Sequence, residues 1–396
     1  MMIKIKDEKE CCGCRACEEV CPKQCITMKR GTLGHLFPSV NEDECVSCNQ
    51  CTKVCPTQDK TLCGCESDRF YVAFSKDKEI RNVSSSGGLF YSLASYFCEK
   101  DNYWIFGSCF NQQTQLKTVG TNNKNNIPLL CKSKYVQSDT TGVFSTIKQL
   151  LEGGDGVLYC ATPCQIAALR LFLKKDYNKL FLIDFFCHGV PSQEYFDKCK
   201  ELVETRDNIR ITGYSFRTKK SRGVTPHYYT VRYIKKGQNK ERTDFYYNSP
   251  FYAAFQSYMN LRESCYNCIF SNRTRFSDVT IGDFHEVEKY KSNINRFDGV
   301  SLVVVNTKKG DLALSDISNS LFIEPIDKKR LITDGVVFAG GTTRPSRRDE
   351  FIADYESIPF FEFNNKWFNK RKFDKQRLYY HLPLFLRKVI KRIKGI

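Results

Sequence analysis

From residue 71 onward, hydrophobic and aromatic residues gather in short runs, and longer amphipathic stretches separate these runs. This alternation is typical of an α/β fold. The pattern predicts strands over residues 71–75, 103–110, 156–161, 180–188, 209–217, 228–234, 278–284, 301–306 and 321–326. It predicts helices over residues 88–98, 143–152, 165–174, 193–205 and 250–261. An antiparallel hairpin section is expected around residues 209–247.

Composition narrows the class of protein. Of 396 residues, 41% are hydrophobic, which excludes general disorder and allows two or three domains. The first ten residues lack the apolar core of a signal peptide, and no run of about 18 apolar residues predicts a membrane span. The 21 cysteines therefore indicate a reducing, cytoplasmic compartment, where clustered thiols bind metal more often than they form disulfides.

The cysteines before residue 60 follow one spacing twice. Both segments have the form C-x2-C-x2-C-x3-C-P, which is the run of bacterial two-cluster ferredoxins. In that arrangement three cysteines hold one [4Fe–4S] cluster, and the fourth lies beyond a short helical step and binds the other cluster. The expected ligand sets are Cys11, Cys14, Cys17 with Cys55, and Cys45, Cys48, Cys51 with Cys21. Structural zinc is the alternative, but it typically uses two separated cysteine pairs.

Four further cysteines, Cys12, Cys25, Cys63 and Cys65, fall outside this spacing and are interpreted as packing residues or incidental thiols. Residues 56–69 are polar and are interpreted as a linker.

Small and hydroxyl residues precede the helix predicted over residues 88–98. Backbone N–H groups at such a helix start suit a phosphate or the polar edge of a flavin, and the glycines allow close approach. An ordinary serine N-cap is the alternative. The residues concerned are Ser84, Ser85, Ser86, Gly87 and Gly88.

Cysteines also mark strand and helix ends in the α/β part. Cys164 starts a helix after the turn that holds Thr162, Pro163 and Gln165, and Cys187 with His188 follows an apolar strand. Strand carboxyl ends are where ligands usually bind in α/β sheets. With Cys265 and Cys268 these make four thiols, the number that a third [4Fe–4S] cluster needs. A zinc site, or unrelated buried cysteines, are the alternatives.

Several strings of the chain resemble the coenzyme F420 hydrogenase/dehydrogenase beta-subunit family, in the bacterial form with an N-terminal two-cluster ferredoxin. They occur in family order over roughly residues 1–330. The strings are SSSGGLF, KSKYVQSD, ATPCQIAALR, DFFCHGVPS, SFRTKK, CYNCIFSNRTRFSDVTIGDF and DGVSLVVVNTKKG.

The resemblance implies an FAD-dependent iron–sulfur oxidoreductase that passes electrons between [4Fe–4S] clusters and FAD and exchanges hydride with a small molecule. Relatives act on coenzyme F420, and bacterial ones are associated with polysaccharide biosynthesis. The implied fold combines α+β and α/β parts: a ferredoxin module, a flavin-binding body and a basic amphipathic C-terminal tail. The expected boundaries are 1–65 for the ferredoxin domain, 66–155 and 156–345 for the N- and C-terminal regions of the beta-subunit family, and 346–396 for the tail.

The resemblance also assigns roles to individual residues. Cys164, Cys187, Cys265 and Cys268 stand at the motifs that hold a third cluster near the flavin. The serine and glycine residues 84–88, with Thr162, Pro163 and Gln165, are expected to contact the cofactor. Lys134 would place a positive charge near the flavin, and Tyr135 a stacking face; a surface lysine is the alternative for Lys134.

Histidines supply the candidate proton donors. His188 is the first and His285 the second, because imidazole titrates near neutral pH. Each is alternatively a hydrogen-bond partner of a cluster ligand. Arg217, Lys219 and Lys220 suit an anionic ligand, or else a solvated hairpin.

The chain departs from the family strings at three places: Ala161 replaces a usual glycine, His285 a usual tryptophan, and the segment after Arg217 lacks a glycine–tryptophan pair. Because the last two changes bear on the substrate pocket, the family's substrates are not carried over.

The formal charge of +17 is uneven along the chain. Residues 361–396 hold eleven Lys or Arg and two acidic residues, interleaved with aromatic residues. Such a basic amphipathic segment suits an anionic membrane surface, which would place the protein peripherally at the inner face of the membrane. Docking on the protein body is the alternative. Three clusters of about −2 each would cancel most of the remaining charge, so nucleic acid is not an expected partner.

Two functions remain open on the sequence. One is the FAD-dependent oxidoreductase, with a ferredoxin or similar redox partner protein as donor and a small-molecule substrate. The other is an electron-transfer subunit that relays electrons to a partner enzyme without its own substrate. A third class, an iron–sulfur nucleic-acid-binding protein, rests on charge alone.

Overall fold

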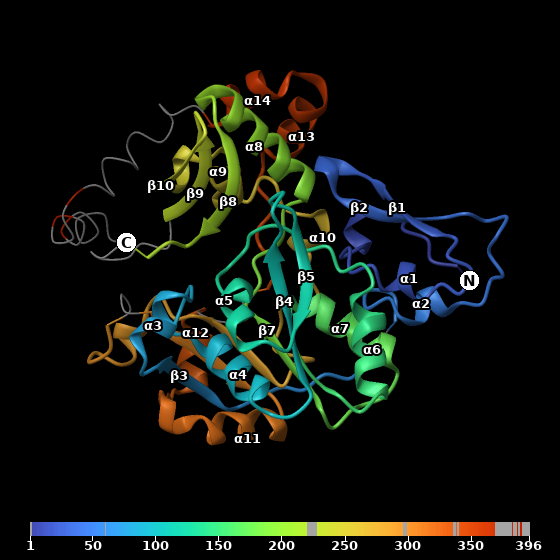
Figure 1. Cartoon of the computed structure of the whole chain (residues 1–396). Helices are drawn as coiled ribbons and strands as arrows, with labels where there is room; N and C mark the ends of the chain where they lie inside the picture. The colour runs from blue at the N-terminus through green and yellow to red at the C-terminus, as the bar shows by residue number, and fades with distance from the viewer. Residues whose placement is uncertain are drawn as a thin grey trace. The chain divides into compact units, whose positions relative to one another are not determined.

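A computed structural model describes residues 2–59, 61–219, 228–295, 299–335, 338, 340–368, 382, 386 and 389. The chain forms two compact units, each discontinuous in sequence. The first comprises Met1–Gln193 and Leu261–Thr343, and the second Glu194–Asn260 and Arg344–Ile396 (Figure 1). These units do not follow the linear boundaries expected from the sequence, which stay predictions of family segments.

The ferredoxin module opens the first unit. Strands β1 (Ile26–Arg30) and β2 (Leu36–Val40) form an antiparallel pair. Short helices α1 (Ala16–Glu19) and α2 (Gln50–Lys53) follow the two cysteine loops, and each leads to the fourth cysteine of its run. A 3-10 helix, Glu8–Glu10, precedes the first loop.

An eight-stranded mixed sheet forms the body of the first unit, in the order β13-β3-β12-β11-β7-β6-β4-β5. Strands β4, β6, β7 and β11 are parallel, and β3 runs in the same direction because two antiparallel pairings separate it from β11. The carboxyl ends of these five strands therefore share one edge of the sheet. Their bounds are β3 Phe70–Ser75, β4 Tyr103–Phe110, β5 Leu116–Thr121, β6 Gly156–Cys160, β7 Leu180–Phe185, β11 Val279–Asp283, β12 Ser301–Val305 and β13 Leu321–Pro325.

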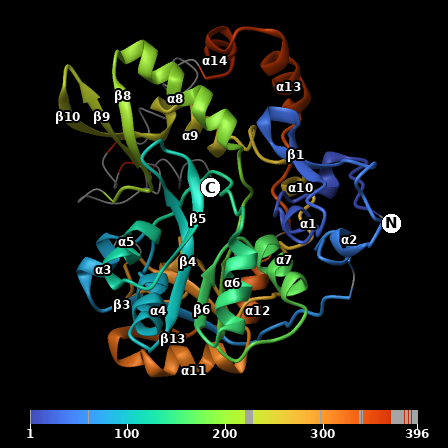
Figure 2. The same ribbon diagram turned by 45° about the vertical axis from the view of Figure 1, so that its right-hand side comes forward.

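Helices cover both faces of this sheet, as Figures 1 and 2 show. On one face, α4 (Leu89–Cys98), α5 (Ile127–Leu130) and α11 (Lys308–Asp316) bury residues against the strands. On the other, α6 (Val143–Glu152) and α7 (Pro163–Leu173) pack on β6 and β7, and α12 (Lys328–Thr333) contributes to a third cluster on β3 and β12. Short helices α3 (Lys78–Asn82) and α10 (Glu263–Tyr266) complete the unit.

The ferredoxin module is continuous with this core. Cys14, Ala16 and Val54 are buried in the same apolar cluster as residues of α6 and α7. Helix α1 contacts both of these helices, and α10 contacts the 3-10 helix Glu8–Glu10. The module is therefore packed on the body that carries the other candidate residues.

The second unit is an antiparallel three-stranded sheet with helices. Its strands are β8 (Arg210–Phe216), β9 (Tyr228–Lys235) and β10 (Gln238–Phe245), in the order β10-β9-β8. Helices α8 (Gln193–Asp207), α9 (Pro250–Gln256), α13 (Arg348–Ser357) and α14 (Phe360–Phe368) belong to it. Its core is rich in aromatic rings, with Tyr195, Phe251 and Phe351 fully buried.

The predicted elements are found, with different ends. Strand β7 ends at Phe185 rather than at His188, so Cys187 and His188 lie in the loop. Helix α9 ends at Gln256 rather than 261, just before Tyr258 adopts a left-handed φ of 57°. The hairpin section expected around 209–247 is confirmed by β8, β9 and β10. Strands β1, β2 and β5 were not predicted.

The start of the expected basic tail is packed rather than free. Helix α14 buries Trp367 and Phe368 against Phe351 of α13, and Trp367 donates to Asp354 at 2.7 Å. These two aromatic residues are therefore part of a core, which corrects their expected role as surface anchors. Apart from residues 382, 386 and 389, the segment 369–396 lies outside the described residues, and the membrane expectation for it stays a prediction. Among the helices that are described, none has both the length and the apolar character of a membrane span.

Candidate functional site

Two cavities in the ferredoxin module are lined by the two expected ligand sets. Cys11, Cys14, Cys17 and Cys55 line one, which we call the inner site. Cys21, Cys45, Cys48 and Cys51 line the other, which we call the outer site. In each case the fourth cysteine comes from the opposite run, as the ferredoxin spacing predicts. Cys48 and Val46 are exposed at the outer site, whereas Cys14 of the inner site is buried in the core shared with α6 and α7.

The two cysteine loops have the same backbone shape. Gly13 and Arg15 have φ of 69° and 64° in the first loop, and Ser47 and Asn49 have φ of 51° and 60° at the equivalent positions of the second. Left-handed residues turn the chain sharply, so each loop curls around its cavity. The doubled sequence motif therefore corresponds to a doubled local structure.

A fifth cysteine lies at each cavity. Cys25 lines the outer site, and its Sγ is 3.4 Å from the Sγ of Cys21. Cys12 lines the inner site. Cys12 and Cys25, interpreted from the sequence as packing residues or incidental thiols, do pack against apolar clusters and also lie beside expected ligands. Cys63 is exposed, and Cys65 pairs with Arg275 through a backbone bridge.

The four cysteines of the body influence one another electrostatically. The charges of Cys265, Cys164 and Cys268 raise the pKa of Cys187, and the charge of Cys164 raises the pKa of Cys268. Burial raises the pKa of Cys187 well above its ordinary value and that of Cys265 to about 12. Thiols that are withdrawn from solvent and influence one another are costly to ionise, and a bound cation compensates by stabilising the thiolates. We call these four residues the body site.

Cys12 lies between the inner site and the body site. Its thiol interacts with both Cys14 and Cys164; the contact with Cys14 and burial raise the pKa of Cys12, whereas the contact with Cys164 lowers it. The hydrogen bond from Cys12 is likewise the largest cause of the raised pKa of Cys164. The inner site and the body site are thus neighbours, linked by a thiol that spacing alone did not single out.

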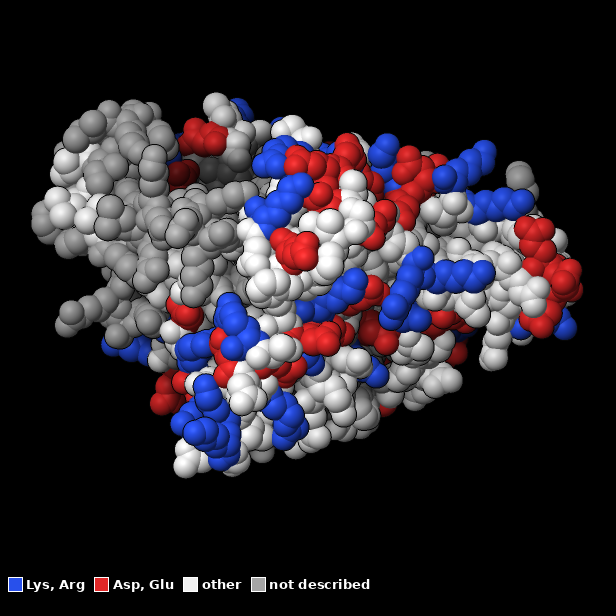
Figure 3. All heavy atoms as spheres, turned by 90° about the horizontal axis from the view of Figure 1, so that it is seen from above, with Lys and Arg blue, Asp and Glu red and all other residues white. Residues whose placement is uncertain are grey.

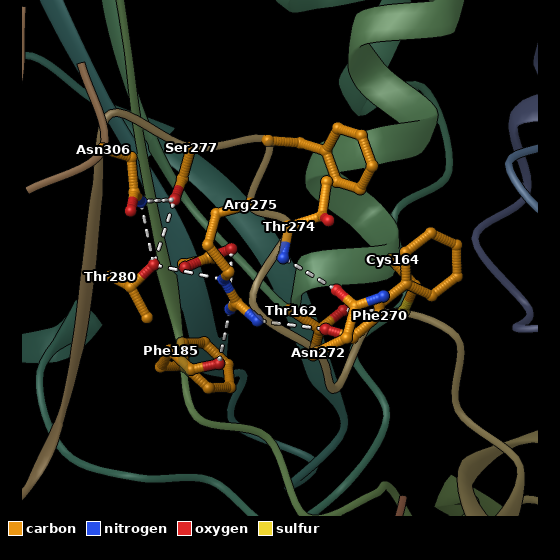
Figure 4. A network of polar contacts seen from close by, with 12 residues as sticks. Thr162, Cys164, Phe185, Phe270, Asn272, Thr274, Arg275, Ser277, Thr280 and Asn306 are labelled. Atoms are coloured by element: carbon orange, nitrogen blue, oxygen red, sulfur yellow. Dashed lines mark hydrogen bonds and ion pairs between the residues drawn. The ribbon is translucent and has the colours of Figure 1, made fainter. Parts of the chain in front are cut away.

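Arg275 anchors the loop that follows the Cys265–Cys268 pair (Figure 4). Its guanidinium is 2% exposed and is 2.8 Å from the carboxylate of the fully buried Asp184. It also donates to the Phe270 carbonyl at 3.0 Å and to Thr280 at 3.2 Å. This network ties the cysteine loop to strands β7 and β11 and holds it at the carboxyl edge of the sheet.

The turn before Cys164 has a structural explanation. Thr162 and Gln165 form a capping box at the start of α7, and Pro163 occupies its first turn. Such caps satisfy the free N–H groups of a helix start. The Thr162 hydroxyl is also 3.2 Å from Cys164 Sγ, so the cap orients that cysteine. A cofactor contact of Thr162, Pro163 and Gln165 stays a prediction.

The serine–glycine loop and the Lys134 loop are adjacent. The backbone N–H of Ser133 donates to Ser85 Oγ at 2.7 Å. Ser84 and Ser86 donate to the carbonyls of Ile80 and Val300, and Gly87 N–H donates to Ser301. Gly88 caps α4 with φ of 90°. A Cβ on Gly87 would lie 2.6 Å from the Ala73 carbonyl, so this position requires glycine.

Lys134 points into the protein. Its Nζ donates to the carbonyls of Leu130, Cys131 and Lys132 at 2.6–3.2 Å. Burial lowers its pKa to about 8. It is therefore not a surface lysine, and neutral carbonyls rather than a carboxylate accept these three hydrogen bonds from its ammonium. The neighbouring Tyr135 is half-buried.

The two candidate histidines share one carboxylate. His285 Nε2 is 3.8 Å from Asp283, at the end of β11. Burial lowers the pKa of His188, and the charge of Asp283 opposes that shift. Both histidine side chains are exposed to solvent, and the charge of Asp283 acts on both of them. Asp283 was not singled out from the sequence, although the string GDF places it at a strand end.

Arg217 and Lys219 belong to the second unit, and Lys220 lies outside the described residues.

Arg262 is the other functional residue that the sequence did not reveal. It is fully buried, and its guanidinium is 3.4 Å from Cys11 Sγ and 2.6 Å from the Cys11 carbonyl. No carboxylate pairs with it among the described residues. Its only sequence signal is its place three residues before Cys265.

The doubled C-x2-C-x2-C-x3-C-P spacing of the ferredoxin module fits iron–sulfur clusters better than zinc, which typically uses two separated cysteine pairs. A [4Fe–4S] core instead spreads its four thiolates over four irons. The buried, uncompensated charge of Arg262 beside the inner site also fits an anionic cluster there.

These features define an iron–sulfur protein with a ferredoxin-type module. Comparison with family models agrees: residues 10–58 match the 4Fe-4S dicluster domain, and residues 154–329 match the C-terminal domain of the beta subunit of coenzyme F420 hydrogenase/dehydrogenase. Residues 154–329 are thus a domain of that beta-subunit family, joined to a dicluster ferredoxin domain, which confirms the resemblance drawn from the sequence.

A chain in the structure of the xenon-derivatised F420-reducing [NiFe] hydrogenase complex from Methanosarcina barkeri is similar to this chain at 17% identity, with a TM-score of 0.43. The match covers 78% of this chain and 92% of that chain. A comparison with curated proteins found no match.

Proposed function

We propose that this protein is an iron–sulfur flavoprotein oxidoreductase. Its ferredoxin module would hold two [4Fe–4S] clusters, the body site a third, and the loops 84–88 and 133–135 an FAD. When bound, the clusters would supply one-electron transfer, and the flavin would exchange an electron pair with a substrate. The proposal rests on the spatial order of the sites. Cys12 interacts with a cysteine of the inner site and with a cysteine of the body site, and all three belong to the first unit.

The positions of the loops 84–88 and 133–135 support the proposed binding of FAD. The serine–glycine loop follows β3, and Cys164 and Cys187 follow β6 and β7, so all three lie at the same sheet edge. Lys134 holds a partly buried charge next to Ser133, which hydrogen-bonds Ser85. A lysine there would stabilise an anionic phosphate or a reduced, anionic flavin.

His188 and His285 are the proposed proton donors for the substrate. Both interact with Asp283, which would hold a proton on either imidazole. The substrate class that the resemblance implies, a deazaflavin or an intermediate of polysaccharide biosynthesis, stays a prediction.

The second candidate is an electron-transfer subunit that passes electrons to a partner enzyme and has no substrate of its own. One observation favours it: the Ser84 and Ser86 hydroxyls and the Lys134 ammonium are already engaged by protein carbonyls. Those groups would then be structural.

Reduction of the flavin by a one-electron donor tests the proposal. The full chain is reconstituted anaerobically with iron, sulfide and FAD, freed of unbound flavin, and mixed with reduced methyl viologen while flavin absorbance is followed. We expect bleaching of bound flavin, slowed at least tenfold in C164S/C187S, which keeps the ferredoxin module. Flavin that does not stay bound, or that bleaches equally fast in the variant, would contradict the proposal.

A further inference from the structure

Arg262 is a buried cation without an acidic partner. Its side chain is 0% exposed and stacks on the ring of Phe37, with Cζ 4.2 Å from the ring centroid. It donates to the Cys11 and Leu36 carbonyls at 2.6 and 2.7 Å, to Gln137 Oε1 at 3.1 Å, and to Cys11 Sγ at 3.4 Å. Within the described part of the chain, all these partners are neutral groups or a cysteine.

A buried guanidinium surrounded by neutral groups is expensive unless an anion lies beside it. The other buried arginine of this unit, Arg275, has such a partner in Asp184. Among the described residues, the one group hydrogen-bonded to Arg262 that can carry negative charge is Cys11, an expected ligand of the inner site. A [4Fe–4S] core with four thiolates carries about −2, so a cluster there would be the missing counter-ion.

Gly13 gives independent support. A Cβ on Gly13 would lie 2.7 Å from Arg262 Nη1 and 2.6 Å from Gln137 Nε2. The equivalent position of the outer loop is Ser47, which adopts a similar left-handed φ with a side chain. The turn itself therefore tolerates a Cβ, and the glycine is needed because Arg262 and Gln137 approach the inner loop closely.

Among the described residues that line the outer site, none is a buried Lys or Arg. Lys23 is the only Lys or Arg among its described lining residues, and it is exposed to solvent, which screens its charge. Arg15 lines the inner site as well, but Glu18 and Asp139 each pair with it at 2.7 Å. The electrostatic difference between the two sites therefore rests on Arg262.

We propose that Arg262 raises the reduction potential of the cluster held at the inner site above that of the cluster at the outer site. Uptake of one electron would take the inner core with its thiolates from about −2 to about −3, and a buried positive charge and an N–H···S bond both favour the more negative state. Arg262 is thus a positioning residue that directs electrons inward, toward Cys12 and the body site. This inference rests on the proposed cluster content of the module.

The backbone of Arg262 also connects the inner site to the body site. Its carbonyl accepts from Cys265 N–H at 2.9 Å, so the residue that contacts the inner site also orients the loop of the body site. One residue thereby touches both sites that Cys12 separates.

The test is a redox titration of the reconstituted full chain with dithionite, followed by electron paramagnetic resonance, for wild type, R262M and R262K. Signals are assigned with C14S for the inner and C48S for the outer cluster. We expect the inner midpoint potential to become more negative in R262M, the outer one to stay unchanged, and R262K to recover most of the shift. R348M, which removes a buried arginine of the second unit that contacts the Met259 carbonyl, is the matched control and should shift neither.

Unchanged potentials in R262M and R262K with full iron content, or equal shifts of both clusters, would overturn the role of Arg262. A wild-type chain that binds no clusters after reconstitution would instead overturn the proposed function. If R262M loses iron, the test rests on R262K, which keeps the positive charge but not the forked hydrogen bonds of arginine. The potential of the inner cluster in R262K must then lie between the potentials of the inner and outer clusters of the wild type.

Discussion

Positively charged side chains withdrawn from solvent lie beside the candidate sites. Arg275 is neutralised by Asp184 and fastens the cysteine loop to the sheet, whereas Arg262 contacts Cys11 and lacks a carboxylate partner among the described residues. Lys134 is a third case, held only by carbonyl dipoles. Each marks an edge of a candidate site, because burying a charge is tolerated where another charge, resident or bound, can balance it.

Lys134 gives a pH-dependent prediction. Its pKa is lowered from 10.5 to about 8 in the folded chain, so between pH 8 and 10.5 the unfolded chain binds the extra proton. Lys134 therefore destabilises the fold at pH 7, and that penalty fades as the pH rises, by up to about 1.4 kcal/mol per pH unit in this window. The free energy of unfolding of K134M minus that of wild type should fall from pH 8 to pH 10.

The measurement is urea unfolding of the chain without cofactors at both pH values. K117M is the control, since it removes an exposed lysine of the edge strand β5. A pH-independent difference between K134M and wild type would contradict the buried placement of Lys134. Loss of FAD retention in K134M but not in K117M would support the flavin role as well.

At the scale of elements, the strands with continuous apolar runs were predictable because both faces of a central strand are buried. Strand β5 was missed because it is an edge strand with exposed residues at alternate positions. Sheet order was not predictable: β3 lies between β12 and β13, which follow it by more than 200 residues. The ferredoxin ligands were predictable because their spacing is local, whereas Arg262 and Cys11 are 251 residues apart.

The packing of α14 predicts that truncation of Trp367 lowers the free energy of unfolding and does not change membrane binding. Trp367 is 6% exposed, and its ring meets Phe351 edge-on at 5.2 Å. W367A should destabilise the second unit by about 3–5 kcal/mol, the usual cost of a buried aromatic truncation. Urea unfolding followed by circular dichroism would measure this.

Vesicle co-sedimentation tests whether Trp367 instead anchors the protein to a membrane. W367A and wild type should bind anionic vesicles equally under native conditions, and removal of residues 369–396 is the matched comparison for the basic segment. An unfolding curve like that of wild type, together with lost vesicle binding in W367A, would show that Trp367 is a membrane anchor after all.

At the scale of the whole molecule, the formal net charge is +17. On the face shown in Figure 3, Lys and Arg side chains are interspersed with Asp and Glu. The cysteine sites all belong to the first unit, with the exposed Cys48 at the outer site and the half-buried Cys187 at the body site. This arrangement suits a protein that receives electrons at its surface and uses them in its interior.

Iron, sulfide and flavin analysis of the anaerobically reconstituted full chain tests the central claim most directly. The account predicts roughly twelve irons and twelve sulfides per chain with one FAD, falling to about eight irons in C265S/C268S. About eight irons and no flavin in the wild type, with no change in the variant, would contradict both the body site and the oxidoreductase and would favour the relay subunit.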